Sequence, residues 1–246
     1  MLYICLHNLS LPVMTFNDSA SLYTYLQSHA DARKAAFAQK LIPDCAHEIL
    51  GWPIPELRKL ARQLARKEGD RVWTLTASSN CHEMILLRGF IIGYAPWPWE
   101  KWSKAVTDFV PAITDWAICD MVCCSLTFIR KHRAAGWDLL RPYWTSREEF
   151  HQRFAVVMLM DHYLTDEYID RVLEVLQSLK PNGYYAVMAV GWALQSAFVK
   201  DPDKVLPLLS SPDIVSESRQ MARKKILESL RTPPEWHQWV KALNVQ

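Results

Sequence analysis

The spacing of apolar residues, which recur every three or four positions along most of the chain, is the strongest constraint on its fold. Only 7 of the 246 residues are glycine, and the alternation of apolar and polar residues that marks β-strands is scarce. Good helix formers fill the segments between breaks. The 14 prolines fall mostly between these segments, as in Pro96-Trp97-Pro98 and Pro181-Asn182-Gly183. Together these features predict an all-α protein.

The periodic segments predict the helix bounds, and several cap residues support them. Asn17, Asp18 and Ser19 are N-cap candidates for the first helix, and Ser146 with Glu149 reads as a capping box. Thr165 and Asp166 are N-cap candidates further along. The predicted helices span residues 19–29, 32–41, 54–68, 80–94, 99–110, 115–133, 147–163, 167–179, 183–200, 203–209, 217–230 and 234–243.

The helices come in pairs that recur roughly every 35 to 40 residues, the period of HEAT-type repeats. Residues 167–179 with 183–200 form one such unit, and residues 203–209 with 216–230 form the next. The predicted fold is therefore a HEAT-like α-solenoid, whose concave face accommodates a duplex or a partner helix. No linker divides the chain, so residues 15–246 are expected to form a single domain. Residues 1–14 are expected to be a loose N-terminal extension.

Charge and cysteine content exclude several classes of protein. The net charge of +2 predicts no general affinity for polyanions, so a nucleic-acid surface would have to be a local patch. The six cysteines form no CxxC pair and are expected to be reduced thiols in a cytoplasmic protein. No apolar run is long enough to span a membrane, and no signal peptide is predicted. No cluster of residues at ligand spacing predicts a metal, and no cofactor is implied.

Trp116 and Asp120 stand four residues apart in an apolar helical stretch, so they share one helix face. An indole beside a carboxylate can hold a cation against both a π face and a formal charge. An indole on an apolar helix is more often part of the core, however, and an Asp beside it is more often a cap or an ion-pair partner.

Other candidate residues lie on later helices. Arg153 stands in the helix over 147–163, and Tyr185 and Trp192 share a face of the helix over 183–200. Each has an ordinary alternative, because aromatic stripes are usually core and an isolated Arg is usually a solvated charge. The segment from residue 216 to residue 231 contains five basic and two acidic residues. This pattern fits either a surface that binds phosphates or an ordinary solvated helix face. This run contains Arg219, Arg223, Lys224, Lys225 and Arg231.

The order of these phrases resembles the AlkD-like DNA alkylation repair proteins, which are HEAT-like α-helical DNA glycosylases. The resemblance begins at about residue 33 and covers most of the chain after it. Trp116-Ala-Ile-Cys-Asp120 resembles the catalytic Trp-x-x-x-Asp segment of that family. Further matching phrases lie at residues 40–43, 51–61, 184–194 and 219–229.

The resemblance implies a role for each matching residue. Asp120 matches the catalytic carboxylate, and Trp116 and Trp192 match the two indoles that flank the lesion. Arg153 matches a basic residue that contacts the DNA backbone, and the basic run is expected to bind DNA through Arg219, Arg223, Lys224 and Lys225. Two departures concern DNA affinity. Gln195 and Pro53 stand where relatives often have Arg.

The implied activity is excision of cationic alkylated purines, 3-methyladenine and 7-methylguanine, from duplex DNA by a monomeric enzyme. Cleavage of an N-glycosidic bond passes through a sugar with oxocarbenium character, which a carboxylate stabilises. A base that already carries a positive charge needs no general acid to leave. Two alternatives remain open at this stage: a non-catalytic HEAT-like protein that binds damaged or branched DNA, and a protein-interaction scaffold.

Overall fold

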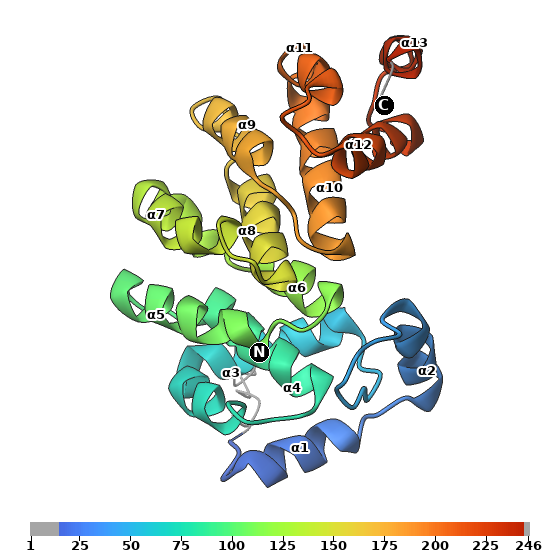
Figure 1. Cartoon of the computed structure of the whole chain (residues 1–246). Helices are drawn as coiled ribbons and strands as arrows, with labels where there is room; N and C mark the ends of the chain where they lie inside the picture. Colours follow the sequence, from blue (N-terminus) through green and yellow to red (C-terminus); the bar gives the residue numbers. More distant parts are fainter. Residues whose placement is uncertain (1–14, 244–246) are drawn as a thin grey trace, which may run out of the picture. The chain divides into compact units, whose positions relative to one another are not determined.

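The computed structural model describes residues 15–243 and confirms the all-α prediction (Figure 1). These residues form thirteen α-helices and three short 3-10 helices. The described part of the chain has no β-strand, only an isolated bridge between Glu48 and Cys81. Among its helices, none combines the length and the apolar character needed to cross a membrane. The predicted extension over residues 1–14 and Cys5 lie outside the described residues.

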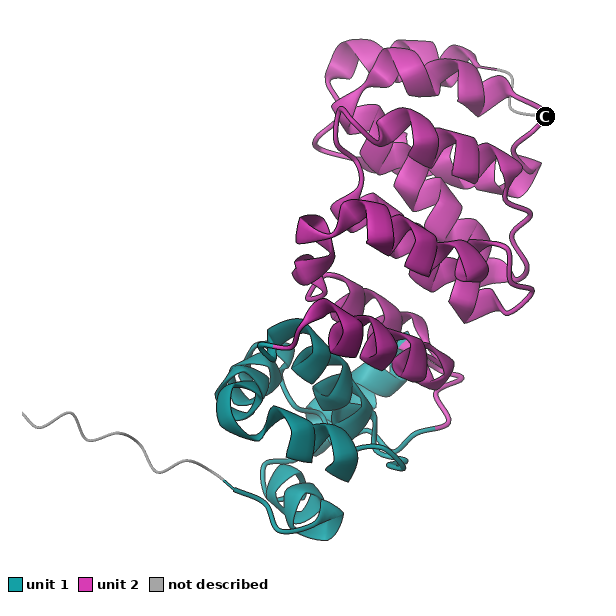
Figure 2. Cartoon of the chain, turned by 90° about the vertical axis from the view of Figure 1, so that its left-hand side faces the viewer, with its two compact units in different colours: residues 1–41, 47–96 teal, residues 42–46, 97–246 magenta. Residues whose placement is uncertain are grey.

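The chain divides into two compact units (Figure 2). Unit 1 comprises residues 1–41 and 47–96, and unit 2 comprises residues 42–46 and 97–246. The expectation that residues 15–246 form a single domain therefore stays a prediction.

Unit 1 contains four helices, α1 (Ser19–Gln27), α2 (Ala32–Leu41), α3 (Ile54–Leu75) and α4 (His82–Tyr94). Asp18 caps α1 as predicted, because its carboxylate accepts a hydrogen bond from the Ser21 amide at 2.7 Å. α3 extends seven residues beyond the predicted end, past a kink at Glu68. The packing of α3 against α4 forms the core of this unit.

Unit 2 contains the remaining helices, which stack in successive layers (Figure 2). Its α-helices are α5 (Trp99–Phe109), α6 (Trp116–Cys123), α7 (Arg133–Trp144), α8 (Glu149–His162), α9 (Ile169–Ser178), α10 (Tyr184–Lys200), α11 (Pro202–Val205), α12 (Ser216–Glu228) and α13 (Pro234–Ala242). The 3-10 helices are η1 (Val110–Ala112), η2 (Thr127–Lys131) and η3 (Leu206–Ser210).

Helix α8 lies at the centre of this unit. It packs against α6 and α7 on one side and against α10 on the other, and α10 in turn packs against α12. At Gly191, a Cβ atom would lie 2.7 Å from the Met221 side chain, so glycine permits the close approach of α10 and α12. The layering of helix pairs agrees with the predicted HEAT-like architecture.

The prediction of one helix over residues 115–133 was wrong. α6 ends at Cys123, and the short η2 separates it from α7. The Ser125 hydroxyl donates to the Val122 carbonyl at 2.7 Å, an interaction that competes with continuation of the helix. α7 itself was not predicted, because Gly136 and Pro142 lower its helix propensity. Gly136 is needed there, since a Cβ atom would lie 2.4 Å from the Ile129 side chain.

Two predicted caps were also wrong. The Ser146 hydroxyl accepts from the Glu148 amide, and Glu148 is the N-cap residue of α8, so no capping box forms with Glu149. α9 begins at Ile169 with Tyr168 as its N-cap residue, so neither Thr165 nor Asp166 caps it. In both places a turn or bend precedes the helix, which begins two residues later than predicted.

Candidate active site at the Asp120–Arg153 pair

The start of α6 places Trp116 and Asp120 on one helix face. Asp115 is the N-cap residue, and its carboxylate accepts a hydrogen bond from the Ile118 amide at 2.9 Å. The helix therefore begins at Trp116, and Asp120 follows one turn later. Both side chains are partly exposed, whereas Ile118, Cys119 and Val122 on the opposite side are buried.

Arg153 on α8 binds both oxygens of Asp120. Its Nε donates to Oδ1 at 3.0 Å and its Nη2 donates to Oδ2 at 2.7 Å. The Arg153 side chain is 3% exposed and that of Asp120 is 12% exposed. Two parallel N–H···O bonds to one carboxylate are the strongest form of Arg–carboxylate pairing, and they fix the orientation of the carboxylate.

Burial and pairing with Arg153 act in opposite directions on the pKa of Asp120. Burial raises the pKa of Asp120, and the two hydrogen bonds from Arg153 oppose that shift. Asp120 in turn raises the pKa of Arg153 against the effect of burial, so the guanidinium stays protonated. An ionised carboxylate is the form that the two charged donors of Arg153 favour.

The third donor nitrogen of Arg153 connects the pair to α10. Arg153 Nη1 donates to the main-chain carbonyl of Tyr185 at 2.9 Å. The Tyr185 ring stacks on Phe150 with centroids 5.5 Å apart, and its amide donates to the Glu149 carboxylate. Arg153 therefore joins α6, α8 and α10 through one side chain, and the first turn of α10 is held against α8 from both sides.

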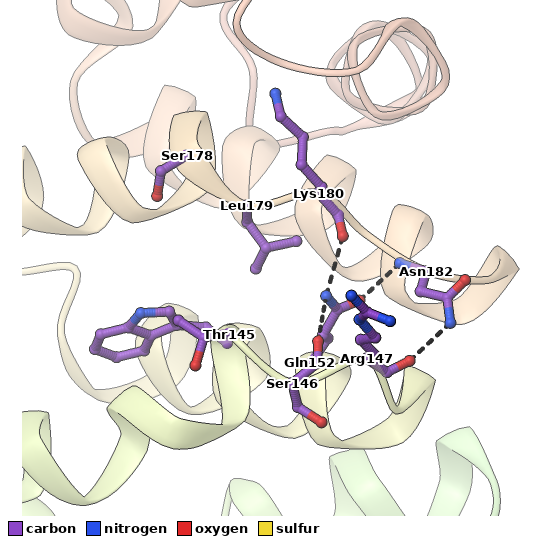
Figure 3. Close-up of a pocket in the computed structure, with 9 residues that line it drawn as sticks. Thr145, Ser146, Arg147, Gln152, Ser178, Leu179, Lys180 and Asn182 are labelled. Atoms are coloured by element: carbon purple, nitrogen blue, oxygen red, sulfur yellow. Dashed lines mark hydrogen bonds between the residues drawn. The ribbon is translucent and has the colours of Figure 1, made fainter.

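Gln152, next to Arg153, holds together the loops that precede α8 and α10 (Figure 3). Its Nε2 donates to the carbonyls of Ser146 and Lys180, at 2.9 and 3.0 Å, and its Oε1 accepts from the Asn182 amide at 2.7 Å. These loops border a cavity of about 410 Å³. None of the predicted catalytic residues lines this cavity, so it is separate from the Asp120 pair.

Trp192 lies on α10, seven residues after Tyr185 and therefore on the same helix face. Its side chain is partly exposed, and within residues 15–243 no aromatic ring packs against it. Trp192 and Tyr185 lie on the same helix, α10. Arg153 binds the Tyr185 carbonyl and the Asp120 carboxylate, so it links α10 to Asp120.

The predicted DNA-binding residues differ in burial and in their partners. Arg153 is buried in the pair described above. On α12, Arg219 is 9% exposed, and Arg223 donates to the carbonyls of Val240 and Lys241 near the end of α13, at 3.0 and 2.8 Å. Of the basic residues predicted on α12, Lys224 is exposed and Lys225 is partly exposed.

The two departures from the family pattern have structural roles. Gln195 is buried and its Nε2 donates to the Ser229 hydroxyl at 3.3 Å, which links α10 to the segment after α12. Pro53 is the N-cap residue of α3. Gln195 is therefore a buried position, whereas Pro53 is exposed to solvent.

Two titratable residues near the pair escaped the sequence-based prediction. Asp161 and His162 end α8, and Asp161 lies within electrostatic range of Asp120. The His162 ring accepts from Arg130 Nε at Nδ1, at 3.0 Å, and donates from Nε2 to the Cys123 carbonyl at 2.8 Å. Nothing in their spacing marks them, because the α6–α8 packing that brings them near Asp120 is a tertiary contact.

Comparison with protein families matches residues 22–232 to the DNA alkylation repair enzyme family. The chain belongs to this family. The match includes Trp116, Asp120, Arg153 and Trp192, so the resemblance to the DNA alkylation repair proteins is confirmed at the level of the family. No curated protein matches the sequence of this DNA alkylation repair enzyme.

Proposed function

We propose that this DNA alkylation repair enzyme is a DNA glycosylase that releases 3-methyladenine and 7-methylguanine from duplex DNA. The supporting observation is the Asp120 carboxylate, which is partly exposed on the same helix face as Trp116 and held in one orientation by Arg153. A preorganised carboxylate of this kind stabilises positive charge that develops in a transition state.

The proposed chemistry requires a negatively charged group near the sugar, and it does not require a general acid. The bond between C1′ of the sugar and N9 of the alkylated guanine, or its counterpart in adenine, breaks with its electron pair going to the base. The base loses its positive charge in this step and leaves neutral. The sugar becomes cationic, and Asp120 stabilises it until a water attacks C1′ and releases its proton to solvent.

The aromatic residues supply a second source of attraction. Trp116 shares a helix face with Asp120, and no other aromatic ring of residues 15–243 packs on the ring of Trp192. The face of an indole attracts a cationic ring or a cationic sugar. Lys224 and Lys225 are the residues of α12 that we expect to contact phosphates, since their side chains are accessible.

Replacement of Asp120 by Asn tests this function. We expect Asp120→Asn to bind methylated duplex DNA normally and to release bases at least about 100-fold more slowly, the usual scale for loss of an electrostatic stabiliser. Asp203→Asn, which removes the same charge from an exposed position on α11, is the matched control. Binding without release by the wild-type protein would instead identify a non-catalytic binder of damaged DNA.

A further inference from the structure

Helix α2 of unit 1 is accessible to solvent along its whole length. None of its ten residues is buried. A helix this short is marginal in water by itself and is normally stabilised by burying one face against its neighbours. Phe37 is instead 64% exposed, and Leu41 is 49% exposed. α2 therefore presents large apolar side chains to solvent, which is a property of contact surfaces.

The first turn of α2 is nevertheless firmly held. The Asp31 carboxylate accepts hydrogen bonds from the amides of Arg33 and Lys34, at 3.0 and 3.1 Å, as an N-cap residue does. The Asp31 amide donates to the Leu50 carbonyl at 2.9 Å. Gly51 has a φ of +86°, and a Cβ atom there would collide with the Asp31 carbonyl oxygen. The loop that contains Gly51 therefore lies directly against the start of α2.

This loop is built around a buried carboxylate. Glu83 is 2% exposed, and its two oxygens accept hydrogen bonds from three consecutive amides. The donors are Leu50, Gly51 and Trp52, at 3.0, 2.7 and 3.2 Å. Trp52 Nε1 in turn donates to the Leu26 carbonyl at 2.7 Å. The start of α2 is thus fixed within unit 1, and its exposed face has a defined orientation there.

Two cations and an aromatic ring share this exposed face. Arg33, Phe37 and Lys40 stand at positions i, i+4 and i+7, which places them in one row along the helix, and all three are exposed. Within residues 15–243 the side chains of Arg33 and Lys40 make no hydrogen bond and no ion pair. Lys34, to the side of this row, pairs with Asp31 at 3.0 Å. α2 itself contains no acidic residue, so the row is positively charged.

A ring between two cations fits a nucleic acid. Arg33 and Lys40 are about 10 Å apart along the helix axis, so they can reach two different phosphates. Phe37 lies between them, where an apolar side chain can pack against a sugar or a base edge. A helix that docks on a membrane surface has its cations on the face opposite its apolar residues. In α2 the cations and the ring lie on the same face, which favours DNA over a membrane.

We propose that the row Arg33–Phe37–Lys40 on α2 is a contact for the DNA backbone, in which the two cations bind phosphates and Phe37 packs against a deoxyribose between them. This proposal rests on the proposed function, because it requires that the chain acts on duplex DNA. It assigns a DNA contact to unit 1, which contains neither Asp120 nor the basic residues of α12. Phosphate contacts carry no sequence information, so the row should bind damaged and undamaged duplexes alike.

The experiment measures the affinity of the full-length chain for an unmodified duplex over a series of salt concentrations. We expect the double variant Arg33→Gln/Lys40→Gln to reduce the slope of log affinity against log salt by about two units, one for each lost phosphate contact. Phe37→Ala should lower the affinity about tenfold and keep the slope, since it removes an uncharged contact. These side chains are exposed, so the replacements remove no buried contact.

The control is Arg66→Gln/Lys67→Gln, which removes the same two charges from exposed positions on α3 and should leave the slope unchanged. An unchanged slope in Arg33→Gln/Lys40→Gln overturns the proposal. An equal reduction in both double variants also overturns it, because the effect would then reflect total charge. Weaker binding of the α2 variants to phosphatidylserine vesicles, with DNA affinity retained, overturns it as well and would identify a membrane contact.

Release of 7-methylguanine from a methylated duplex is measured separately on the wild-type protein. No release, together with the expected change of slope in the α2 variant, overturns the proposed function alone. Release by the wild type, together with an unchanged slope in the α2 variant, overturns this inference alone.

Discussion

Arg153 holds both oxygens of Asp120 while its third donor nitrogen binds the Tyr185 carbonyl. The sequence-based prediction assigned this arginine to the DNA backbone. Its guanidinium is instead buried and spans three helices, so we expect it to act first as a positioning residue for the carboxylate. Whether it also reaches a phosphate stays a prediction.

Arg153→Lys keeps the positive charge and removes the bidentate geometry. We expect base release to fall about 10- to 100-fold, because a single ammonium cannot fix both carboxylate oxygens. Arg153→Met should cost about 3–5 kcal/mol of unfolding free energy, since it leaves the charge of Asp120, whose side chain is 12% exposed, without its partner. Base release and urea unfolding measure the two effects, and equal activity of Arg153→Lys and the wild type would contradict the positioning role.

The adjacent residues Asp161 and His162 should have opposite effects on stability in acid. The pKa of Asp161 is raised from 3.8 to about 6 in the folded protein, so folding takes up a proton there and stability rises as the pH falls from 6 to 4. The pKa of His162 is lowered from 6.5 to about 4, so the unfolded chain takes up the proton and stability falls over the same range.

Unfolding free energies measured between pH 4 and 7 separate these two contributions. Asp161→Asn should be more stable than the wild type at pH 7 by about 1–3 kcal/mol, and the difference should vanish near pH 4. His162→Gln should flatten the loss of stability in acid. A pH profile of Asp161→Asn parallel to that of the wild type would show that Asp161 titrates normally.

Gly183 should tolerate no side chain. Its φ of +90° is unfavourable for other residues, and a Cβ atom would lie 2.4 Å from the Glu149 carboxylate. We expect Gly183→Ala to cost about 1–3 kcal/mol and to slow base release, since Glu149 holds the amide of Tyr185. Adding Glu149→Ala should recover part of the stability and none of the activity. Wild-type activity in Gly183→Ala would show that the position of the first turn of α10 does not control the geometry of the Asp120–Arg153 pair.

Arg223 and Lys224 are neighbours on α12 with different expected roles. Arg223 donates to two carbonyls near the end of α13, so Arg223→Gln should lower the melting temperature and leave the salt dependence of DNA binding unchanged. Lys224 is exposed, and Lys224→Gln should reduce the slope of log affinity against log salt by about one unit if it contacts a phosphate. If Arg223→Gln reduced the salt slope and Lys224→Gln lowered the melting temperature instead, Arg223 would be the phosphate contact and Lys224 the structural residue.

Sequence patterns predicted the helical class and most helix bounds, because the apolar periodicity that they record is the same one that buries these helices. They failed where a local signal was weak. The segment after Cys123 keeps its apolar residues while Ser125 and the Cys123–His162 contact end the helix. Conversely, α7 forms despite Gly136 and Pro142, because Trp137 and Leu140 are buried by neighbouring helices.

For the candidate site, the sequence identified Asp120, Trp116, Arg153 and Trp192 through their place in matching phrases. It could not show that Arg153 pairs with Asp120, since these residues are 33 positions apart and only the packing of α6 against α8 joins them. The same limit hid Asp161. A count of basic residues on α12 also could not separate a cation that holds a neighbouring helix from one that faces solvent.

The side-on approach of Arg153 determines which lone pairs of Asp120 remain available. Nε and Nη2 bind the syn lone pairs of the two carboxylate oxygens. An incoming water or sugar meets the anti lone pairs, which are intrinsically the weaker bases. On the proposed chemistry, departure of the base should therefore run well ahead of water attack, and base release should show little slowing in deuterated water.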